Sequence, residues 1–215
     1  MILKTITVRP FSSNCYLVGC ESTRKGMIVD PGAEPGSILA AVAELGLTVS
    51  LIVATHGHID HVGAVQAIRE ETGAPFAMHE LESGNPYIER MTERICRMLD
   101  VASEPPSPPD RLVGDGEILE VGDLRFTVIH VPGHSDGGLA LYGNGVVFSG
   151  DTLFQFDVGQ TNFPGGSHRA MMAAICDKLL VLPDDTIVYP GHGLPTVIHR
   201  ERDWNPFVQA WRRDG

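Results

Sequence analysis

The chain has 215 residues, a length that fits one domain with a full two-layer core. Hydrophobic residues make up 43% of it and charged residues 20%, and no apolar run approaches the roughly 20 residues that span a bilayer. The formal net charge is -11 with only 16 Lys and Arg residues, which excludes a protein that holds phosphate backbones. We therefore expect a single globular domain, residues 1–215, that acts on neither membranes nor nucleic acid.

The first residues of the chain and its cysteines bear on the compartment. Residues 1–8 show no basic segment followed by an apolar stretch and a small-residue cleavage site, so they carry no signal-peptide pattern. The four cysteines have neither CxxC spacing nor the density of a disulfide scaffold, which is typical of a reducing compartment. We expect a cytoplasmic location.

The first half of the chain alternates strand and helix patterns. The predicted order is strands at residues 2–8, 15–19 and 26–29, a helix at 37–45, a strand at 50–54, a helix at 62–72, a strand at 75–78 and a helix at 85–102. The run at 50–54 is apolar throughout, which is typical of a strand buried on both faces. Residues 103–109 hold four prolines and predict an extended linker.

The second half repeats this order. The patterns predict strands at residues 117–121, 124–131, 139–142 and 146–149, a helix at 167–182, a strand at 186–189 and a helix-like tail. Two similar halves of this kind predict two stacked sheets between helical layers, an α/β fold.

Three histidines and one aspartate crowd a six-residue segment directly after the apolar strand: His56, His58, Asp60 and His61. Such clustering costs desolvation and repulsion unless a cation compensates for it. Imidazoles and carboxylates are ligands that zinc, iron and manganese accept. Gly57 lets the loop bend between two of them. The segment therefore predicts a metal site.

Three further polar residues follow predicted strands in the same way. His134, Asp151 and His192 each come after an apolar run and a glycine, in the segments PGHS, SGDT and PGHG. A tight turn with a glycine places a polar side chain just beyond the edge of a sheet. This recurrence strengthens the metal-site prediction beyond a lone histidine cluster.

The succession HGHIDH, PGHS, SGDT and PGHG resembles the metallo-β-lactamase superfamily, whose motif is HxHxDH followed by a distant His, Asp and His. The match extends over almost the whole chain. Within the superfamily, GDTLF, the paired glycines at 165–166, the LLVLP stretch at 179–183 and the tail ERDWNP at 201–206 are similar to small glyoxalase II-like (hydroxyacylglutathione hydrolase-like) proteins. The resemblance implies a four-layer αββα sandwich with two mixed sheets between helices.

The resemblance also implies that seven residues share two divalent metal ions. The implied ligands are His56, His58 and His134 for one ion, Asp60, His61 and His192 for the other, and Asp151 as the bridge between them. Six terminal ligands and one bridging carboxylate leave each ion an open position for a shared water. We expect zinc, while iron and manganese also suit these ligands.

A dinuclear centre of this kind predicts a hydrolase whose nucleophile is a metal-bridging hydroxide. Acyl-thioesters suit it, because a thiol with a pKa of about 8.5 leaves as a thiolate without much protonation. The resemblance implies S-lactoylglutathione or a related thiol conjugate as the substrate. We assign Asp60 and Asp151 to the catalytic machinery.

Three residues near the metal ligands are predicted to bind substrate. Gln160 and Asn162 stand in GQTN, where relatives often show Gly-Arg-Thr-Asp. His168 follows a glycine pair at a predicted helix start, where backbone N–H groups can hold an anionic group. Residues 194–215 stand where full-length glyoxalase II enzymes carry a helical domain that supplies much of the glutathione site. The sequence therefore does not predict which thiol the substrate carries.

Two other activities fit the same ligands. A persulfide dioxygenase of this fold binds one iron through positions matching His56, His134 and Asp151, but those relatives usually carry Ala-His where this chain has Gly191-His192. A lactonase fits the dinuclear site as well. A class B1 β-lactamase is disfavoured, because Asp151 stands where those enzymes have a cysteine.

Overall fold

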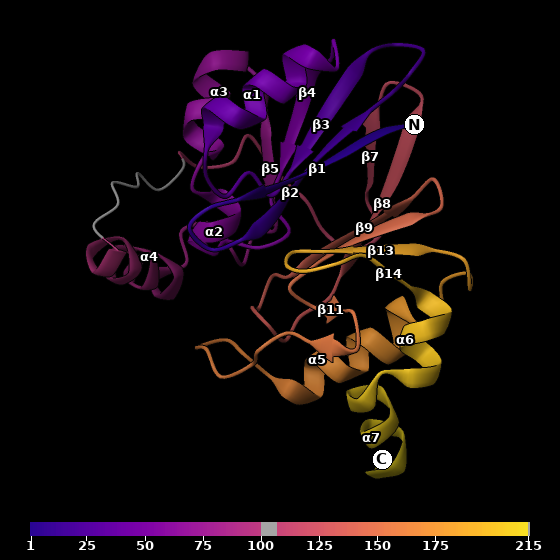
Figure 1. The fold of residues 1–215 in the computed structure, drawn as a ribbon. Helices are drawn as coiled ribbons and strands as arrows, with labels where there is room; N and C mark the ends of the chain where they lie inside the picture. Colours follow the sequence, from indigo (N-terminus) through magenta and orange to yellow (C-terminus); the bar gives the residue numbers. More distant parts are fainter. Residues whose placement is uncertain (100–106, 215) are drawn as a thin grey trace.

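Two six-stranded mixed sheets form the centre of the molecule in the computed structural model, which describes residues 1–99 and 107–214 (Figure 1). The first sheet has the order β1 (Ile2–Val8), β2 (Ser13–Gly19), β3 (Lys25–Val29), β4 (Thr48–Val53), β5 (Phe76–Met78), β6 (Arg111–Leu112). Its strands run antiparallel from β1 to β3 and parallel from β3 to β6.

The second sheet comes from the later part of the chain. Its order is β14 (Thr196–Val197), β13 (Ile187–Pro190), β10 (Val146–Gly150), β9 (Leu139–Gly143), β8 (Leu124–His130), β7 (Ile118–Val121). Only β10 and β13 pair in parallel, and the remaining pairs are antiparallel. A two-stranded ribbon of β11 (Leu153–Phe154) and β12 (Asp157–Val158) follows β10.

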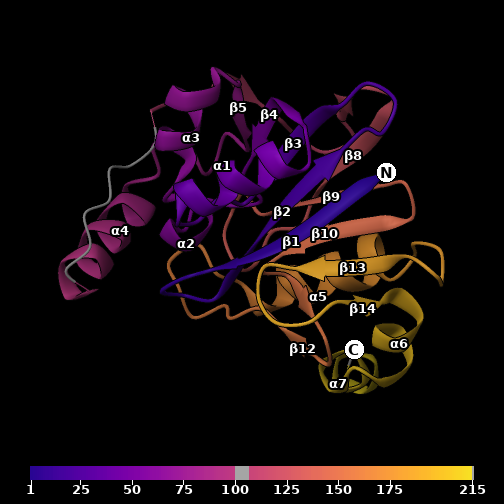
Figure 2. The ribbon, with the colours of Figure 1, turned by 45° about the horizontal axis from the view of Figure 1, so that its top comes forward.

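Helices cover the outer faces of both sheets (Figure 2). The helices are α1 (Pro35–Glu44), α2 (Ile59–Val62), α3 (Val65–Thr72), α4 (Pro86–Leu99), α5 (His168–Ala174), the π-helix η1 (Ile175–Leu179), α6 (Ile198–Trp204) and α7 (Pro206–Asp214). α1 and α3 lie on the first sheet, and α5, α6 and α7 lie beside the second, while α4 stands apart at the side of the molecule.

Three buried apolar clusters hold these layers together. The central one lies between the sheets and joins Tyr16 and Val53 of the first to Phe126 and Phe148 of the second. Outer clusters bury the apolar faces of α1 and α3 against the first sheet and of α5 and η1 against the second. The predicted αββα sandwich with two mixed sheets is therefore confirmed.

Two predicted helices have different bounds in the structure. The helix predicted at 62–72 begins only at Val65, as α3, and Val62 is the last residue of α2. The helix is interrupted between them where Gly63 lies close to the carbonyl of Gly32 and Ala64 N donates to the carbonyl of Pro31. The helix predicted at 167–182 ends as the π-helix η1, closed by Leu180 N donating to the carbonyl of Ile175.

Other boundaries follow the predictions closely, with a few exceptions. α4 ends at Leu99, and residues 100–102 of the predicted helix and 103–106 of the predicted linker lie outside the described residues. The two-residue strands β6, β11, β12 and β14 are absent from the predictions, because two residues are too few to show a period. Within residues 1–99 and 107–214, no helix combines the length and the apolar character needed to cross a bilayer.

Candidate metal centre

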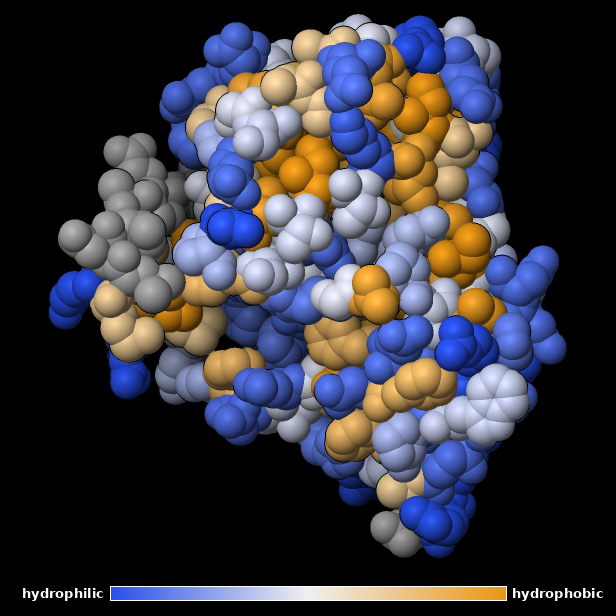
Figure 3. All heavy atoms as spheres, viewed as in Figure 1, coloured by the Kyte–Doolittle hydropathy of each residue, from blue (hydrophilic) through white to orange (hydrophobic). Residues whose placement is uncertain are grey.

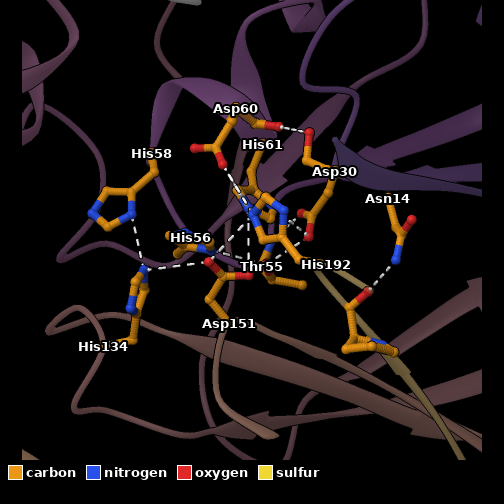
Figure 4. Close-up of polar contacts among 12 residues, drawn as sticks. Asn14, Asp30, Thr55, His56, His58, Asp60, His61, His134, Asp151 and His192 are labelled. Carbon is orange, nitrogen blue, oxygen red and sulfur yellow. Dashed lines mark hydrogen bonds and ion pairs between the residues drawn. The ribbon is translucent and has the colours of Figure 1, made fainter. Parts of the chain in front are cut away.

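The seven predicted ligands meet at one rim of the sandwich, where four strands end (Figure 4). His56 and His58 follow β4, and Asp60 and His61 lie in the short helix α2. The other three each follow a strand of the second sheet, and they are His134 after β8, Asp151 after β10 and His192 after β13. The site therefore lies between the two sheets, with ligands from both.

One group of ligand atoms comes from three buried histidines. Nε2 of His134 lies 2.9 Å from Nδ1 of His58, and the two rings meet edge to face. His56 completes the group, since one ring nitrogen from each of the three lies within 4.8 Å of the others. All three side chains are less than 9% exposed. This group matches the first predicted ion site.

A second group combines a carboxylate with two histidines. Oδ2 of Asp60 lies 3.1 Å from Nε2 of His192 and 3.5 Å from Nε2 of His61. His61 is fully buried, whereas the side chain of His192 is 31% exposed. The second group therefore opens toward solvent at His192.

Asp151 lies between the two groups. Its Oδ1 is 3.5 Å from Nε2 of His61, and its Oδ2 is 3.7 Å from Nε2 of His134 and 3.6 Å from Nε2 of His192. One carboxylate thus faces histidines of both groups, as a bridging ligand requires.

Hydrogen-bonding partners behind the rings fix their orientation. Nδ1 of His56 lies 3.1 Å from Thr55 Oγ1, and Nδ1 of His134 lies 2.7 Å from the carbonyl oxygen of Gln160. Nδ1 of His192 lies 3.3 Å from the carbonyl oxygen of Ser12. An imidazole held at one nitrogen presents the other in a fixed direction, which is how proteins orient metal ligands.

Two histidines of the first group, His56 and His58, are held neutral. Burial lowers the pKa of His58 to about 3, with a further contribution from the neighbouring His134. Burial and the surrounding imidazoles also lower the pKa of His56 well below its usual range. Neutral imidazoles carry the lone pairs that metal binding needs.

The second group attracts positive charge. Burial opposes a charge on His61, but the carboxylates of Asp60, Asp151 and Asp30 outweigh it and raise the pKa of this imidazole. Burial likewise opposes a charge on His192, yet the contacts with Asp60 and Asp151 raise its pKa. Burial favours a neutral Asp60, but His61 and His192 hold the pKa of its carboxyl below the usual range. The carboxylates of this group therefore stabilise positive charge beside them.

The residues present fit two divalent cations. Within the described ranges, Nε2 of His56, Nε2 of His61 and Oδ1 of Asp151 are buried without a hydrogen-bond partner. A buried polar atom without a partner costs about 1–3 kcal/mol, which coordination to a cation removes. These three atoms also lie within 4.8 Å of one another, between the two groups.

Comparison with known proteins identifies the family. The model of the metallo-β-lactamase superfamily matches residues 8–192. This chain belongs to the metallo-β-lactamase superfamily. The hydroxyacylglutathione hydrolase GloC of Haemophilus influenzae is a relative with 34% sequence identity, and the matched region covers 98% of this chain and 99% of GloC.

Solved structures of this superfamily share the fold over most of their length. The B3 metallo-β-lactamase BLEG-1 superposes with a TM-score of 0.89 at 34% identity, covering 96% of this chain and 99% of that one. TTHA1623 in a di-iron-bound form superposes with a TM-score of 0.83 at 36% identity, covering 95% of this chain and 99% of that one. ETHE1 from Myxococcus xanthus superposes with a TM-score of 0.82 at 31% identity, covering 98% of this chain and 85% of that one.

A solvent-open cleft of about 630 Å³ leads to the superfamily's metal site in this chain. Its wall includes five of the seven ligands, together with several apolar side chains: Phe11, Met91, Ile95, Phe154, Val158, Phe163 and Leu194. Phe163 stands edge-on to both His58 and His134 at about 5.5 Å between ring centres. A substrate that reaches the metal site therefore passes between apolar walls.

The three residues predicted to bind substrate lie in different places. Gln160 lines the cleft, and its carbonyl oxygen also faces His134. Asn162 is exposed and lies outside the lining of the cleft. His168 is exposed at the first residue of α5 and stands edge-on to Trp211. Of the three, only Gln160 is placed to contact a molecule in the cleft.

Asp30 is a site residue that the sequence analysis missed. It is buried after β3, where its Oδ2 lies 3.1 Å from Nδ1 of His61 and accepts a hydrogen bond from Thr55 Oγ1. Its Oδ1 accepts from Thr55 N. The only signal in the sequence was an aspartate before Pro-Gly at a strand end, which also suits an ordinary turn.

Glu82 is a second missed residue. It is 3% exposed, and its two oxygens accept hydrogen bonds from Gly57 N at 2.8 Å and Gly137 N at 2.7 Å. Gly57 lies between two ligands of the first sheet, and Gly137 follows His134 of the second. Glu82 therefore ties together the two loops that carry the first group of histidines.

We expect Asp30→Asn to weaken metal binding by roughly 10- to 100-fold, because the amide no longer supplies the negative charge that holds Nδ1 of His61. Affinity is measured by competition with a chromophoric chelator. Asp184→Asn makes the same chemical change at an exposed ion pair with Arg202 and should leave affinity unchanged. Equal affinities in the two variants would contradict the role given to Asp30.

Proposed function

We propose that this protein hydrolyses acyl-thioesters at a dinuclear metal centre, with S-lactoylglutathione or a related thiol conjugate as substrate. The observation that carries the proposal is the pair of ligand groups joined by Asp151 at the end of an open, apolar-walled cleft. The full-length similarity to a protein named hydroxyacylglutathione hydrolase supports the thioester class.

Zinc is the metal that we propose, with iron and manganese as alternatives for the same ligands. The di-iron-bound neighbour supports a count of two ions. Divalent cations bound in this way polarise a carbonyl oxygen and lower the pKa of a bound water. The ligands that would hold them are, in one group, His56, His58 and His134, in the other, Asp60, His61 and His192, and, between the groups, Asp151.

The chain's own side chains orient the reactants. Asp60 remains ionised, since its pKa lies below the usual range, so its carboxylate can accept a hydrogen bond from an attacking water. Phe154, Phe163 and Leu194 form apolar walls beside the position of the reacting carbonyl. Gln160, on the same wall, is the polar group that we assign to substrate binding.

The leaving group explains why a thioester suits this site. A thiolate with a conjugate-acid pKa of about 8.5 departs without a strong proton donor. Among the described residues that line the cleft, the titratable side chains are five of the metal ligands and the exposed Asp157. Side chains bound to a cation are poor proton donors, so the cleft offers a leaving group little protonation. Ordinary esters and amides, whose leaving groups need protonation, are therefore poorer substrates.

A mononuclear-iron persulfide dioxygenase is the second candidate. The similarity to ETHE1 favours it, as do His56, His134 and Asp151, which can hold a single iron. Against it stands the second group of ligands, which brings Asp60 and His192 to 3.1 Å and which a single iron on His56, His134 and Asp151 would leave uncoordinated. A lactonase remains an alternative on the same metals.

Metal analysis and three assays on one preparation distinguish the candidates. We expect two metal ions per chain, thiol release from S-lactoylglutathione, and neither oxygen uptake with glutathione persulfide nor hydrolysis of a chromogenic cephalosporin. Oxygen uptake with one iron per chain and no thiol release would replace the hydrolase with the dioxygenase.

A further inference from the structure

A second cavity of about 490 Å³ opens from the cleft along α4. The two cavities share four lining residues, His58, Met91, Ile95 and Phe163. Beyond this junction the second cavity is lined by residues of α4 and by one residue after Phe163, and these are Tyr87, Ile88, Arg90, Arg94, Met98 and Pro164. We call this second cavity the α4 groove.

The apolar side of α4 faces the groove instead of a core. Tyr87, Met91, Ile95 and Met98 recur at helical spacing, yet the three buried apolar clusters include none of the described residues of α4. Tyr87 is 57% exposed and Met98 is 74% exposed. In Figure 3 the apolar side chains of this helix border a hollow in the surface. The stripe is thus available to a ligand.

Two arginines give the groove a positively charged wall. Arg90 and Arg94 line it, lie one helical turn apart and belong to the part beyond the junction with the cleft. Neither takes part in an ion pair with the residues that the structure describes. In a chain with a net charge of -11, two such cations on one groove wall favour an anionic ligand group.

The groove begins at the metal site itself. His58 belongs to the first group of ligands and lines both cavities, and Phe163 packs edge-on against it. A molecule whose reacting carbonyl lies at the metal site can therefore extend one arm past Phe163 and along α4. That arm meets apolar side chains first and arginines farther out.

We propose that the α4 groove binds one arm of the substrate, an apolar chain that ends in an anionic group. This inference rests on the proposed thioesterase function and narrows its substrate class. Met91 and Ile95 contact the chain near the metal site, and Arg90 and Arg94 pair with the terminal anion.

Matched thioesters test the proposal by kinetics. In the first pair, the lactoyl thioesters of 8-mercaptooctanoate and of octanethiol, the thiol arm ends with or without an anion. In the second pair, the octanedioyl and octanoyl thioesters of N-acetylcysteamine, the acyl arm ends with or without an anion. In one of these two pairs, the pair whose arm occupies the groove, we expect the anionic thioester to have a kcat/KM about tenfold above that of the neutral thioester. The double variant Arg90→Gln/Arg94→Gln should lose that preference, and Arg97→Gln, on the same helix but outside the groove, should keep it.

A binding measurement separates failure of this inference from failure of the proposed function. Octane-1-sulfonate and octan-1-ol are titrated calorimetrically into the metal-loaded protein, with no turnover needed. We expect the sulfonate to bind about tenfold more tightly than the alcohol, and the double arginine variant to remove the difference. Thioester hydrolysis without any arginine dependence in either experiment would overturn the groove proposal alone. Arginine-dependent sulfonate binding without thioester hydrolysis would overturn the thioesterase and retain an anion-binding groove.

Discussion

Asp151→Ala is expected to lose metal and activity together. Its carboxylate faces histidines of both ligand groups, at 3.5 Å from His61 and 3.7 Å from His134. Without it, the negative charge that would lie beside two bound cations is gone, and their repulsion would no longer be offset. We expect at least one of the two ions to be lost and thioester hydrolysis to fall about 10³-fold, the effect of a few kcal/mol.

Elemental analysis and steady-state kinetics on the purified variant check this result, with circular dichroism to show that the fold is retained. Asp136→Ala is the matched control, because Asp136 is an exposed aspartate only two residues from His134 and belongs to none of the ligand groups. Its activity should stay within about twofold of the parent protein. Full activity in Asp151→Ala would refute the ligand assignment.

Gly191→Ala is the second variant for which we expect a large effect. A Cβ at this position would lie 2.1 Å from Oδ1 of Asp151 and 2.7 Å from Cε1 of His61. Both distances are far shorter than a van der Waals contact, so the methyl group must displace two ligand side chains or the backbone of β13. We expect activity to fall about 10²-fold or more, since a ligand displaced by 1 Å costs this much. Metal content should fall as well.

Gly36→Ala provides the control for this substitution. Gly36 lies in α1, and a Cβ there would meet nothing within 4 Å. Replacing a helical glycine with alanine should raise the free energy of unfolding by about 0.5–1 kcal/mol and leave metal content unchanged. Both variants are compared by urea denaturation and by elemental analysis. Normal metal content in Gly191→Ala would show that the site tolerates the methyl group, contrary to the geometry.

The sequence by itself determined the family, the sandwich fold and the ligand candidates. Local signals suffice for these. His56, His58, Asp60 and His61 stand within six residues, and each later candidate follows an apolar strand and a glycine. Strand and helix periods are likewise local, because they depend on neighbouring side chains along one element. Most predicted elements therefore lie within a few residues of the observed ones.

Only the tertiary structure decided which residues support the ligands. Asp30 reaches His61 across 31 positions of sequence, and Glu82 reaches Gly137 across 55. A lone buried carboxylate has no periodic pattern, so its role appears only when the two sheets meet. The same holds for the break at Gly63, which lies close to the carbonyl of Gly32.

The α4 groove is the clearest case of a feature that the fold alone reveals. An amphipathic helix at 85–102 could be predicted, but its pattern does not tell whether the apolar side packs on a core or lines a cavity. That depends on where the helix stands relative to Phe163, more than 60 residues later in the sequence. Sequence periodicity fixes which side chains share a helix face, and only the packing of distant segments decides what that face contacts.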